Sequence, residues 1–203
     1  GEFAGLGGDQ RYIRFRGRGQ QFWNVGNSGF IFSVLAEGGT IIPLQERPGQ
    51  GVDDVLLTDR FFLGEPQFRG FAIRGVGPRV LTQQYQLDAN GNPVLITERR
   101  QTRDDAIGGR NYYLGRAELE IPLGSGAREM GLRPSIFAVA GSVFGITTPV
   151  LNSLRNGLTR CRNDTSGVVT EFANSAACAS GSTAIFSVPA FEERFLGDTW
   201  KPR

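Results

Sequence analysis

Apolar and polar side chains alternate along several long stretches of the chain, and alternation is the spacing of a β-strand with two unlike faces. Over residues 11–24 one face is apolar or small and the other is basic: Ile13, Phe15, Gly17, Gly19 and Trp23 lie opposite Arg14, Arg16 and Arg18. A short turn rich in Gly and Asn, residues 25–29, leads to a second stretch at 30–42, as in a β-hairpin. The division into an apolar and a charged face is typical of a wall between lipid and water.

A third stretch, residues 107–123, shows the same division. Its two faces are Tyr113, Gly115, Ala117, Leu119 and Ile121 on one side and Arg116, Glu118 and Glu120 on the other. A turn at 124–131 leads to a fourth stretch, 132–146, whose faces are less cleanly divided. These stretches are longer than the about 5–6 residues of a typical strand in a soluble sheet. They reach the about 9–11 residues that cross a bilayer at a tilt.

Connections between the stretches alternate in length. The turns at 25–29 and 124–131 are short, whereas the loop 43–106 is long and polar and the tail 147–203 is irregular. Within the loop, residues 80–86 and 94–100 form a predicted small hairpin. Short turns at one end and long loops at the other are typical of a transmembrane β-barrel, of which the smallest have about eight strands. The sequence therefore predicts an all-β fold that is a partial transmembrane antiparallel β-barrel.

Composition narrows the possible chemistry. The 203 residues include no histidine, which excludes a Ser-His-Asp or Cys-His nucleophile and a histidine-bound metal centre. Two cysteines are too few for a four-thiolate metal site. The 22 basic and 20 acidic side chains leave a net charge of +2, without the basic excess of a nucleic-acid-binding domain. We therefore expect no catalytic residues, no metal, no cofactor and no nucleic-acid partner.

The most specific motifs lie in the long loop and in the stretch after it. They are FRGF at 68–71, RGVGPR at 74–79, DDAIGGRNY at 104–112 and AELEIPL at 117–123. In this order and at these separations they resemble the Omp85 superfamily, whose Arg-Gly-Phe signature lies in the sixth extracellular loop. The supporting positions of the pattern are Gly75, Gly77, Pro78, Asp105, Gly108 and Gly109.

The resemblance covers most of residues 5–146 and implies a domain organisation. Residues 1–146 would supply about four strands of a sixteen-stranded barrel, and the loop 43–106 would fold back into the lumen. Residues 147–203 would form a long extracellular loop, with the chain stopping before the final strands.

The resemblance also implies roles for individual residues. Arg69 would be the lumen anchor of the loop, because a guanidinium forms planar, paired hydrogen bonds with carboxylates. Gly70 would let the backbone approach the wall, since it has no Cβ, and Phe71 would pack beside the arginine. Glu118 occupies the position of the family's wall glutamate, and Glu120 is a second possible partner. The family usually has an aspartate where this chain has Val139, so Arg69 is expected to rely on Glu118 alone or on Glu120.

Cys161 and Cys178 lie 17 residues apart in the tail. In a cytosolic protein they would be free thiols. In a cell-surface loop that has passed through the oxidising periplasm we expect a disulfide, which would restrain the loop.

By resemblance, the protein would lie in the outer membrane of a Gram-negative bacterium and would fold and insert β-barrel proteins without enzymatic chemistry. Its partners would be unfolded outer-membrane β-barrel proteins as substrates, outer-membrane lipid and the accessory lipoproteins of an assembly complex. The family pairs an incoming strand with the seam between its first and last barrel strands. This chain contains neither strand, so we expect no insertion by the chain alone.

Two alternatives remain open. One stays in the superfamily, as a two-partner secretion pore or a TamA-like module. The other is a soluble, glycine-rich β-sandwich that acts as a surface-binding module, whose strands would be short and whose loops would not alternate in length.

Overall fold

The computed structural model describes residues 1–5, 10–27, 29–89, 92–123, 131–155, 157–173, 178–197 and 199–202. Apart from one 3-10 helix, η1 (Leu57–Asp59), the regular elements in these ranges are β-strands. Among the described residues, no helix has the length and apolar character needed to cross a membrane. The chain forms two compact units, which we describe separately: Gly1–Arg79, Ala106–Pro149 and Gly197–Arg203 make the first, and Val80–Asp105 with Val150–Leu196 makes the second.

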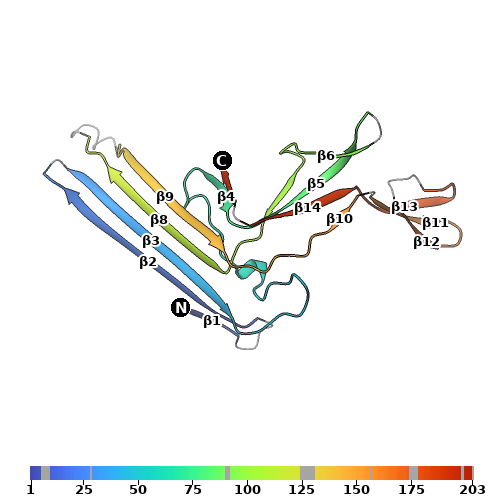
Figure 1. The fold of residues 1–203 in the computed structure, drawn as a ribbon, viewed down its shortest axis with the longest axis horizontal. Coiled ribbons are helices and arrows are strands. Elements are labelled where there is room, and N and C mark those ends of the chain that lie inside the picture. Colours follow the sequence, from blue (N-terminus) through green and yellow to red (C-terminus); the bar gives the residue numbers. More distant parts are fainter. Residues whose placement is uncertain are drawn as a thin grey trace. The chain divides into compact units, whose positions relative to one another are not determined.

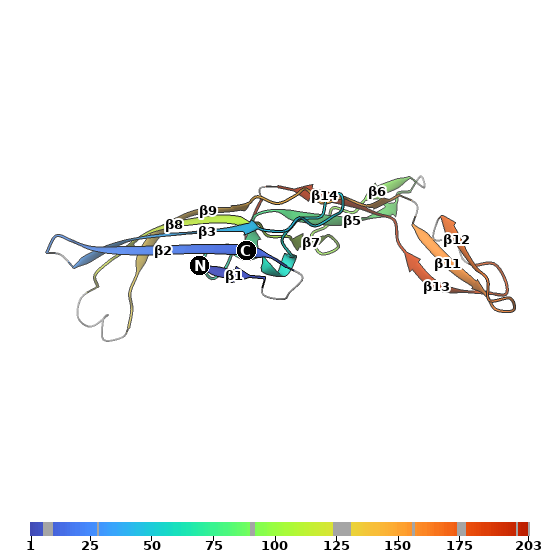
Figure 2. The ribbon, with the colours of Figure 1, turned by 90° about the horizontal axis from the view of Figure 1, so that it is seen from below.

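The first unit is built on an antiparallel sheet with the strand order β1-β2-β3-β8-β9 (Figure 1). Its strands are β1 (Glu2–Ala4), β2 (Tyr12–Val25), β3 (Phe30–Pro43), β8 (Asn111–Glu120) and β9 (Ser135–Phe144). The four long strands run side by side in both views of the ribbon (Figure 2). β2 and β3 have 14 residues each and β8 and β9 have 10 each, enough to cross a bilayer.

The strand ends differ from the predicted stretches at two places. β2 and β3 nearly coincide with 11–24 and 30–42, whereas β8 and β9 are shorter than 107–123 and 132–146. β8 begins only at Asn111 because Gly108, with a φ of +61°, turns the backbone as the chain returns from the loop. Of the predicted turns, residues 28 and 124–130 lie outside the described residues.

Residue pairing divides this sheet into an apolar face and a polar face. The apolar face carries uncharged side chains on every long strand, among them Phe15, Trp23, Phe32, Val34, Ala36, Tyr113, Ala117, Ile136, Ala138 and Phe144. Trp23 stacks on Phe32 near the β2–β3 turn, with 5.8 Å between the ring centroids, and the Tyr113 and Phe144 rings meet toward the opposite ends of the strands at 6.4 Å. Small residues lie between these aromatic pairs. Two aromatic girdles around an apolar band are typical of the lipid-facing wall of a transmembrane barrel.

The polar face is covered in part by the chain that connects β3 to β8. Three residues of this connection, Leu63, Phe68 and Val76, are buried against four residues of the sheet: Leu35, Tyr112, Leu114 and Val143. Phe61, Phe71 and Val139 border the same cluster. Nearby, Val55 of the connection packs with Tyr12 and Ile41. Burial of this apolar surface favours a loop folded onto the sheet, at about 25 cal/mol per Å².

The connection contains β4 (Phe71–Val76), which pairs antiparallel with β15 (Trp200–Pro202). Gly77 N–H donates to the Thr199 carbonyl at 2.9 Å, and the Thr199 hydroxyl donates to the Gly77 carbonyl at 2.8 Å. The last residues of the chain, Gly197–Arg203, therefore belong to the first unit, although they follow the second unit in the sequence.

The second unit contains two small sheets. One has the order β10-β14-β5-β6, formed by Ser153–Leu154, Phe191–Leu196, Arg79–Leu87 and Pro93–Leu95, and β7 (Arg103–Ala106) also pairs with β5. The other has the order β12-β11-β13, formed by Val169–Ala173, Leu158–Asn163 and Ser182–Val188. The predicted hairpin of 80–86 with 94–100 corresponds to the pairing of β5 with the shorter β6; residues 90 and 91 of its turn lie outside the described part of the chain.

Candidate functional site

The Arg-Gly-Phe motif leads into β4, whose first residue is Phe71, and lies against the polar face of the main sheet. Phe68, which precedes it, is only 3% exposed and anchors the segment in the apolar cluster. The Phe68 and Phe71 rings pack edge to face with 4.8 Å between their centroids. These two rings fix the backbone on either side of Arg69 and Gly70.

Arg69 contacts one of the two predicted carboxylates. Its Nη1 donates a hydrogen bond to Oε1 of Glu118 on β8 at 3.3 Å. The same oxygen accepts the Ser135 hydroxyl at 2.6 Å, and the other oxygen of Glu118 lies 3.8 Å from Nε of Arg116. Within the described residues, Arg69 makes no ion pair with Glu120. The Glu118 carboxylate is therefore the one that the structure brings to the loop arginine.

An aromatic ring is the second partner of Arg69. The guanidinium lies over Phe137 of β9, with 4.8 Å between its central carbon and the ring centroid. Phe137 is the direct cross-strand neighbour of Glu118. Val139, two residues further on, borders the apolar cluster and brings no second carboxylate. Phe71, expected beside the arginine, packs its ring against that of Phe68.

The expected reason for Gly70 is wrong. A Cβ built at Gly70 would meet no heavy atom within 4 Å, so the backbone makes no close approach there. Its φ is +86°, which costs a residue with a side chain about 1–2 kcal/mol. Glycine is required at this position by the conformation of the turn.

Close approaches occur at other glycines of the predicted pattern: Gly75, Gly77, Gly108 and Gly109. A Cβ at Gly109 would lie 2.5 Å from the carbonyl oxygen of Phe144, and a Cβ at Gly77 would lie 2.8 Å from the Cβ of Val143. The backbone on either side of the loop therefore lies directly on the end of β9.

Pro78 and Asp105, the other two supporting residues, have different surroundings. Pro78 is buried, and its carbonyl accepts the N–H of Ile107 at 3.0 Å. Asp105 is exposed and pairs with Arg103 at 2.6 Å.

A second carboxylate on the polar face, Glu37, is absent from the predicted site. Its side chain is 5% exposed, and its Oε1 accepts Nε of Arg16 at 3.0 Å and the Tyr112 hydroxyl at 2.7 Å. Arg18 lies 3.9 Å from the other oxygen. The register of the β2–β3 hairpin, which sets Arg18 opposite Glu37, is the signal that could have revealed this cluster.

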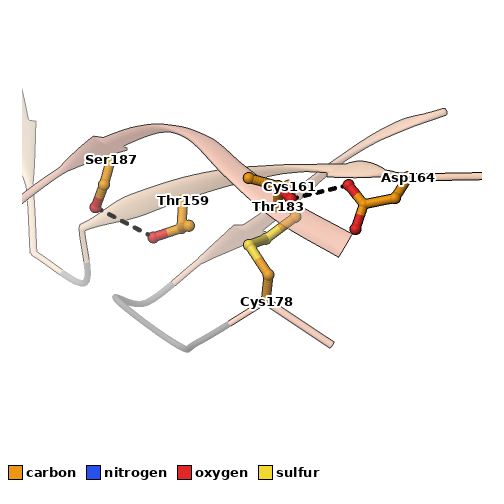
Figure 3. The surroundings of a disulfide bond; sticks show 6 residues. All are labelled: Thr159, Cys161, Asp164, Cys178, Thr183 and Ser187. Atoms are coloured by element: carbon orange, nitrogen blue, oxygen red, sulfur yellow. Dashed lines mark hydrogen bonds between the residues drawn. A yellow bond between two sulfur atoms is a disulfide. The ribbon is translucent and has the colours of Figure 1, made fainter. Parts of the chain in front are cut away.

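The predicted disulfide is present in the second unit. Cys161 of β11 and Cys178 are bonded, with 5.7 Å between their Cα atoms, and Cys161 is 1% exposed (Figure 3). Hydrogen bonds on either side strengthen the small sheet: the Thr183 hydroxyl donates to Asp164 at 2.8 Å, and the Thr159 and Ser187 hydroxyls lie 3.4 Å apart. The disulfide thus joins the central strand of this sheet to the chain that leads into β13.

The arrangement is suited to holding a loop on a wall. The partly exposed ion pair of Arg69 with Glu118 joins the connection to the sheet, the Phe137 ring packs against the same arginine, and the apolar cluster buries the residues beside it. In the described ranges, no group of three or more Cys, Asp or Glu side chains could hold a metal ion.

Comparisons with known proteins agree with this architecture. The model of the Omp85 superfamily domain matches residues 1–179. The chain is 30% identical over 145 residues to the outer membrane protein assembly factor BamA of Neorickettsia risticii (strain Illinois), a match that covers 71% of this chain and 16% of that protein. With most of its length matched by the family model, and with a sheet whose strand lengths and two faces fit a partial transmembrane barrel, this chain belongs to the Omp85 superfamily.

Proposed function

We propose that this chain is part of an assembly factor that folds and inserts β-barrel proteins into the outer membrane of a Gram-negative bacterium. The relative that it resembles is named for outer-membrane protein assembly, and the chain spans 16% of the length of that relative. The activity belongs to a larger protein, to which this chain contributes wall strands and an inner loop. It acts without enzymatic chemistry, through strand pairing and membrane insertion.

The two faces of the sheet suit the two environments of such a wall. The apolar face, with exposed Phe15, Trp23 and Ile136, faces outer-membrane lipid. The polar face, with Arg16, Glu37 and Glu118, faces the lumen. Unfolded outer-membrane β-barrel proteins are the substrates, and accessory lipoproteins complete the assembly complex.

The contact between Arg69 and Glu118 carries this proposal. It joins the signature loop of the family to the barrel wall across 49 positions of the sequence. A charge-assisted hydrogen bond contributes about 1.5–3 kcal/mol. Because the Arg69 side chain is 43% exposed, solvent screening reduces the contribution of this contact to about 1 kcal/mol. The wall and the loop then move as one body while a substrate strand pairs elsewhere on the barrel.

The test uses the complete protein that contains this segment, reconstituted in vesicles of outer-membrane lipid. The variant Arg69→Ala is expected to slow the insertion of an unfolded β-barrel substrate by about fivefold, the effect of about 1 kcal/mol. The exposed Arg103→Ala, whose side chain is 76% accessible, is the matched control and should insert substrate at the unaltered rate. Equal insertion by Arg69→Ala and the unaltered protein would refute the proposed role.

A further inference from the structure

Asp53 is a buried carboxylate in the connection between β3 and β8, away from the Arg69 site. Its side chain is 2% exposed. Oδ1 accepts the N–H of Val55 at 3.0 Å, and Oδ2 accepts the N–H of Thr147 at 2.7 Å. Thr147 follows β9, so this side chain joins two segments that are 94 positions apart.

Two arginines neutralise the Asp53 carboxylate. Nη2 of Arg60 lies 3.8 Å from Oδ1, and Nε of Arg110 lies 3.8 Å from Oδ2. Asp54 adds a second negative charge, 3.6 Å from Nη1 of Arg110. Burial lowers the pKa of Arg60, and the Asp53 carboxylate acts in the opposite direction. We call Asp53, Asp54, Arg60 and Arg110 the Asp53 network.

Both arginines also bind backbone carbonyls of other segments. Arg60 donates from Nε to the Val55 carbonyl at 3.1 Å and from Nη1 to the Ile107 carbonyl at 2.9 Å. Arg110 donates from Nε to the Gly145 carbonyl at 2.8 Å. The network therefore fastens together the start of the connection, its return to β8 and the chain that leaves β9.

The network is continuous with the segment that carries Arg69. Phe61 directly follows Arg60 and exchanges two backbone hydrogen bonds with Gly109, at 2.9 and 3.0 Å. Leu63 and Phe68 then enter the apolar cluster next to Arg69. A shift of Arg60 would be transmitted along this short, packed stretch of chain.

We propose that Asp53 is a positioning residue, which sets the register of the inner loop on the barrel wall and couples it to the surface segment after β9. This inference rests on the proposed function, in which the anchored loop supports assembly. Loss of the Asp53 charge should destabilise the fold, because it leaves the largely buried Arg60 guanidinium without its counter-charge. Arg110 keeps a second partner in Asp54. A purely local role would require only the neighbouring Val55 contact, whereas Asp53 bridges three segments.

The first experiment measures the position of the loop directly. Spin labels at Gln67→Cys in the loop and Ile136→Cys on the outer face report one distance in the complete protein; the native cysteines are bonded to each other and do not react. Asp53→Asn is expected to broaden and shift this distance distribution. Asp164→Asn, the same substitution at an exposed aspartate that accepts a hydrogen bond in the second unit, is the control and should leave it unchanged. An unchanged distribution in Asp53→Asn would overturn the inference.

The second experiment separates positioning from general damage. In a double-mutant cycle on insertion rate, Asp53→Asn and Arg69→Ala should be non-additive, with a combined loss at least about threefold smaller than the product of the single losses. Independent losses that multiply would contradict the inference. If Asp53→Asn does not fold, Arg60→Lys, which keeps the charge but loses the Ile107 contact, takes its place in both experiments.

The two proposals fail in different ways. Normal insertion by Arg69→Ala together with a shifted label distance in Asp53→Asn would refute the proposed role of the Arg69–Glu118 contact in assembly and support the positioning role of Asp53. Slow insertion by Arg69→Ala with an unmoved distance in Asp53→Asn would do the reverse.

Discussion

The guanidinium of Arg69 lies over the ring of Phe137, with 4.8 Å between its central carbon and the ring centroid. Arg69 also contacts the Glu118 carboxylate, with 3.3 Å between Nη1 of the arginine and Oε1 of the glutamate. Val139 stands where the family usually has an aspartate, so this chain holds its loop arginine with one carboxylate and one aromatic ring. A cation–π contact at a partly exposed site contributes about 0.5–1 kcal/mol.

The ring of Phe137 should therefore contribute measurably to the stability of the folded barrel. Phe137→Leu is expected to lower the free energy of unfolding in urea by about 0.5–1 kcal/mol, whereas Phe137→Tyr keeps a ring and should be close to neutral. Phe22→Leu serves as the control, because it removes a 56% exposed ring of β2 that lies on the same face of the sheet as Phe137. If Phe137→Leu lowers the free energy of unfolding by the same amount in an Arg69→Ala background as in the unaltered protein, the ring does not stabilise the arginine.

Gly109 should tolerate no side chain. In Gly109→Ala the new Cβ would lie 2.5 Å from the carbonyl oxygen of Phe144 and 2.8 Å from its nitrogen, and backbone atoms of a paired strand cannot move aside easily. Overpacking of this kind costs about 1–3 kcal/mol. Gly115→Ala, whose nearest neighbour would be 3.9 Å away, should differ little from the unaltered protein in urea unfolding. Equal stability of the two variants would contradict the close approach.

A charged residue on the apolar face should destabilise the protein in a membrane. Ala36→Lys, in the middle of β3 on this face, is expected to reduce the free energy of folding into lipid vesicles by about 2–4 kcal/mol. Gln20→Lys lies at nearly the same level on the polar face of β2, which we propose faces the lumen, and should change the free energy of folding little. If the two lysine variants lose similar free energies of folding, the two faces are assigned incorrectly.

Loss of the disulfide should affect the second unit alone. The double substitution Cys161→Ala and Cys178→Ala removes a cross-link that closes a 17-residue separation, worth about 3 kcal/mol in the chain-entropy model. Limited proteolysis of intact cells is expected to cut the variant within residues 157–188 and to leave the barrel strands whole. Labelling of either thiol in the unaltered protein without reductant would contradict the bond.

The two faces of the sheet could be predicted from the sequence because alternation is a local signal. The fourth strand, β9, is harder to recognise from the sequence, and its structure explains why. The inner face of β9 carries Phe137, Val139 and Val143, which lie against the loop or its arginine, so both faces of this strand are apolar. A loop that covers a strand removes the alternation by which the strand is recognised.

The candidate site was predictable only as far as family resemblance reached. The pairing of Arg69 with Glu118 follows from the motif, but the roles of Phe137, Glu37 and Asp53 depend on contacts between distant segments, and no local pattern marks them. Gly70 shows the same limit. The motif marks it as a site residue, but glycine is needed there because φ is +86°, and not because the backbone makes a close approach.

An exchange of charges between Arg69 and Glu118 tests the central claim most directly. In the complete protein, Arg69→Glu and Glu118→Arg should each slow the insertion of a β-barrel substrate into vesicles, because each places like charges in contact. The double variant should recover much of the lost rate, since the opposite charges are restored. Single variants that insert substrate normally, or a double variant as slow as the slower single, would contradict a loop anchored to the barrel wall through this pair.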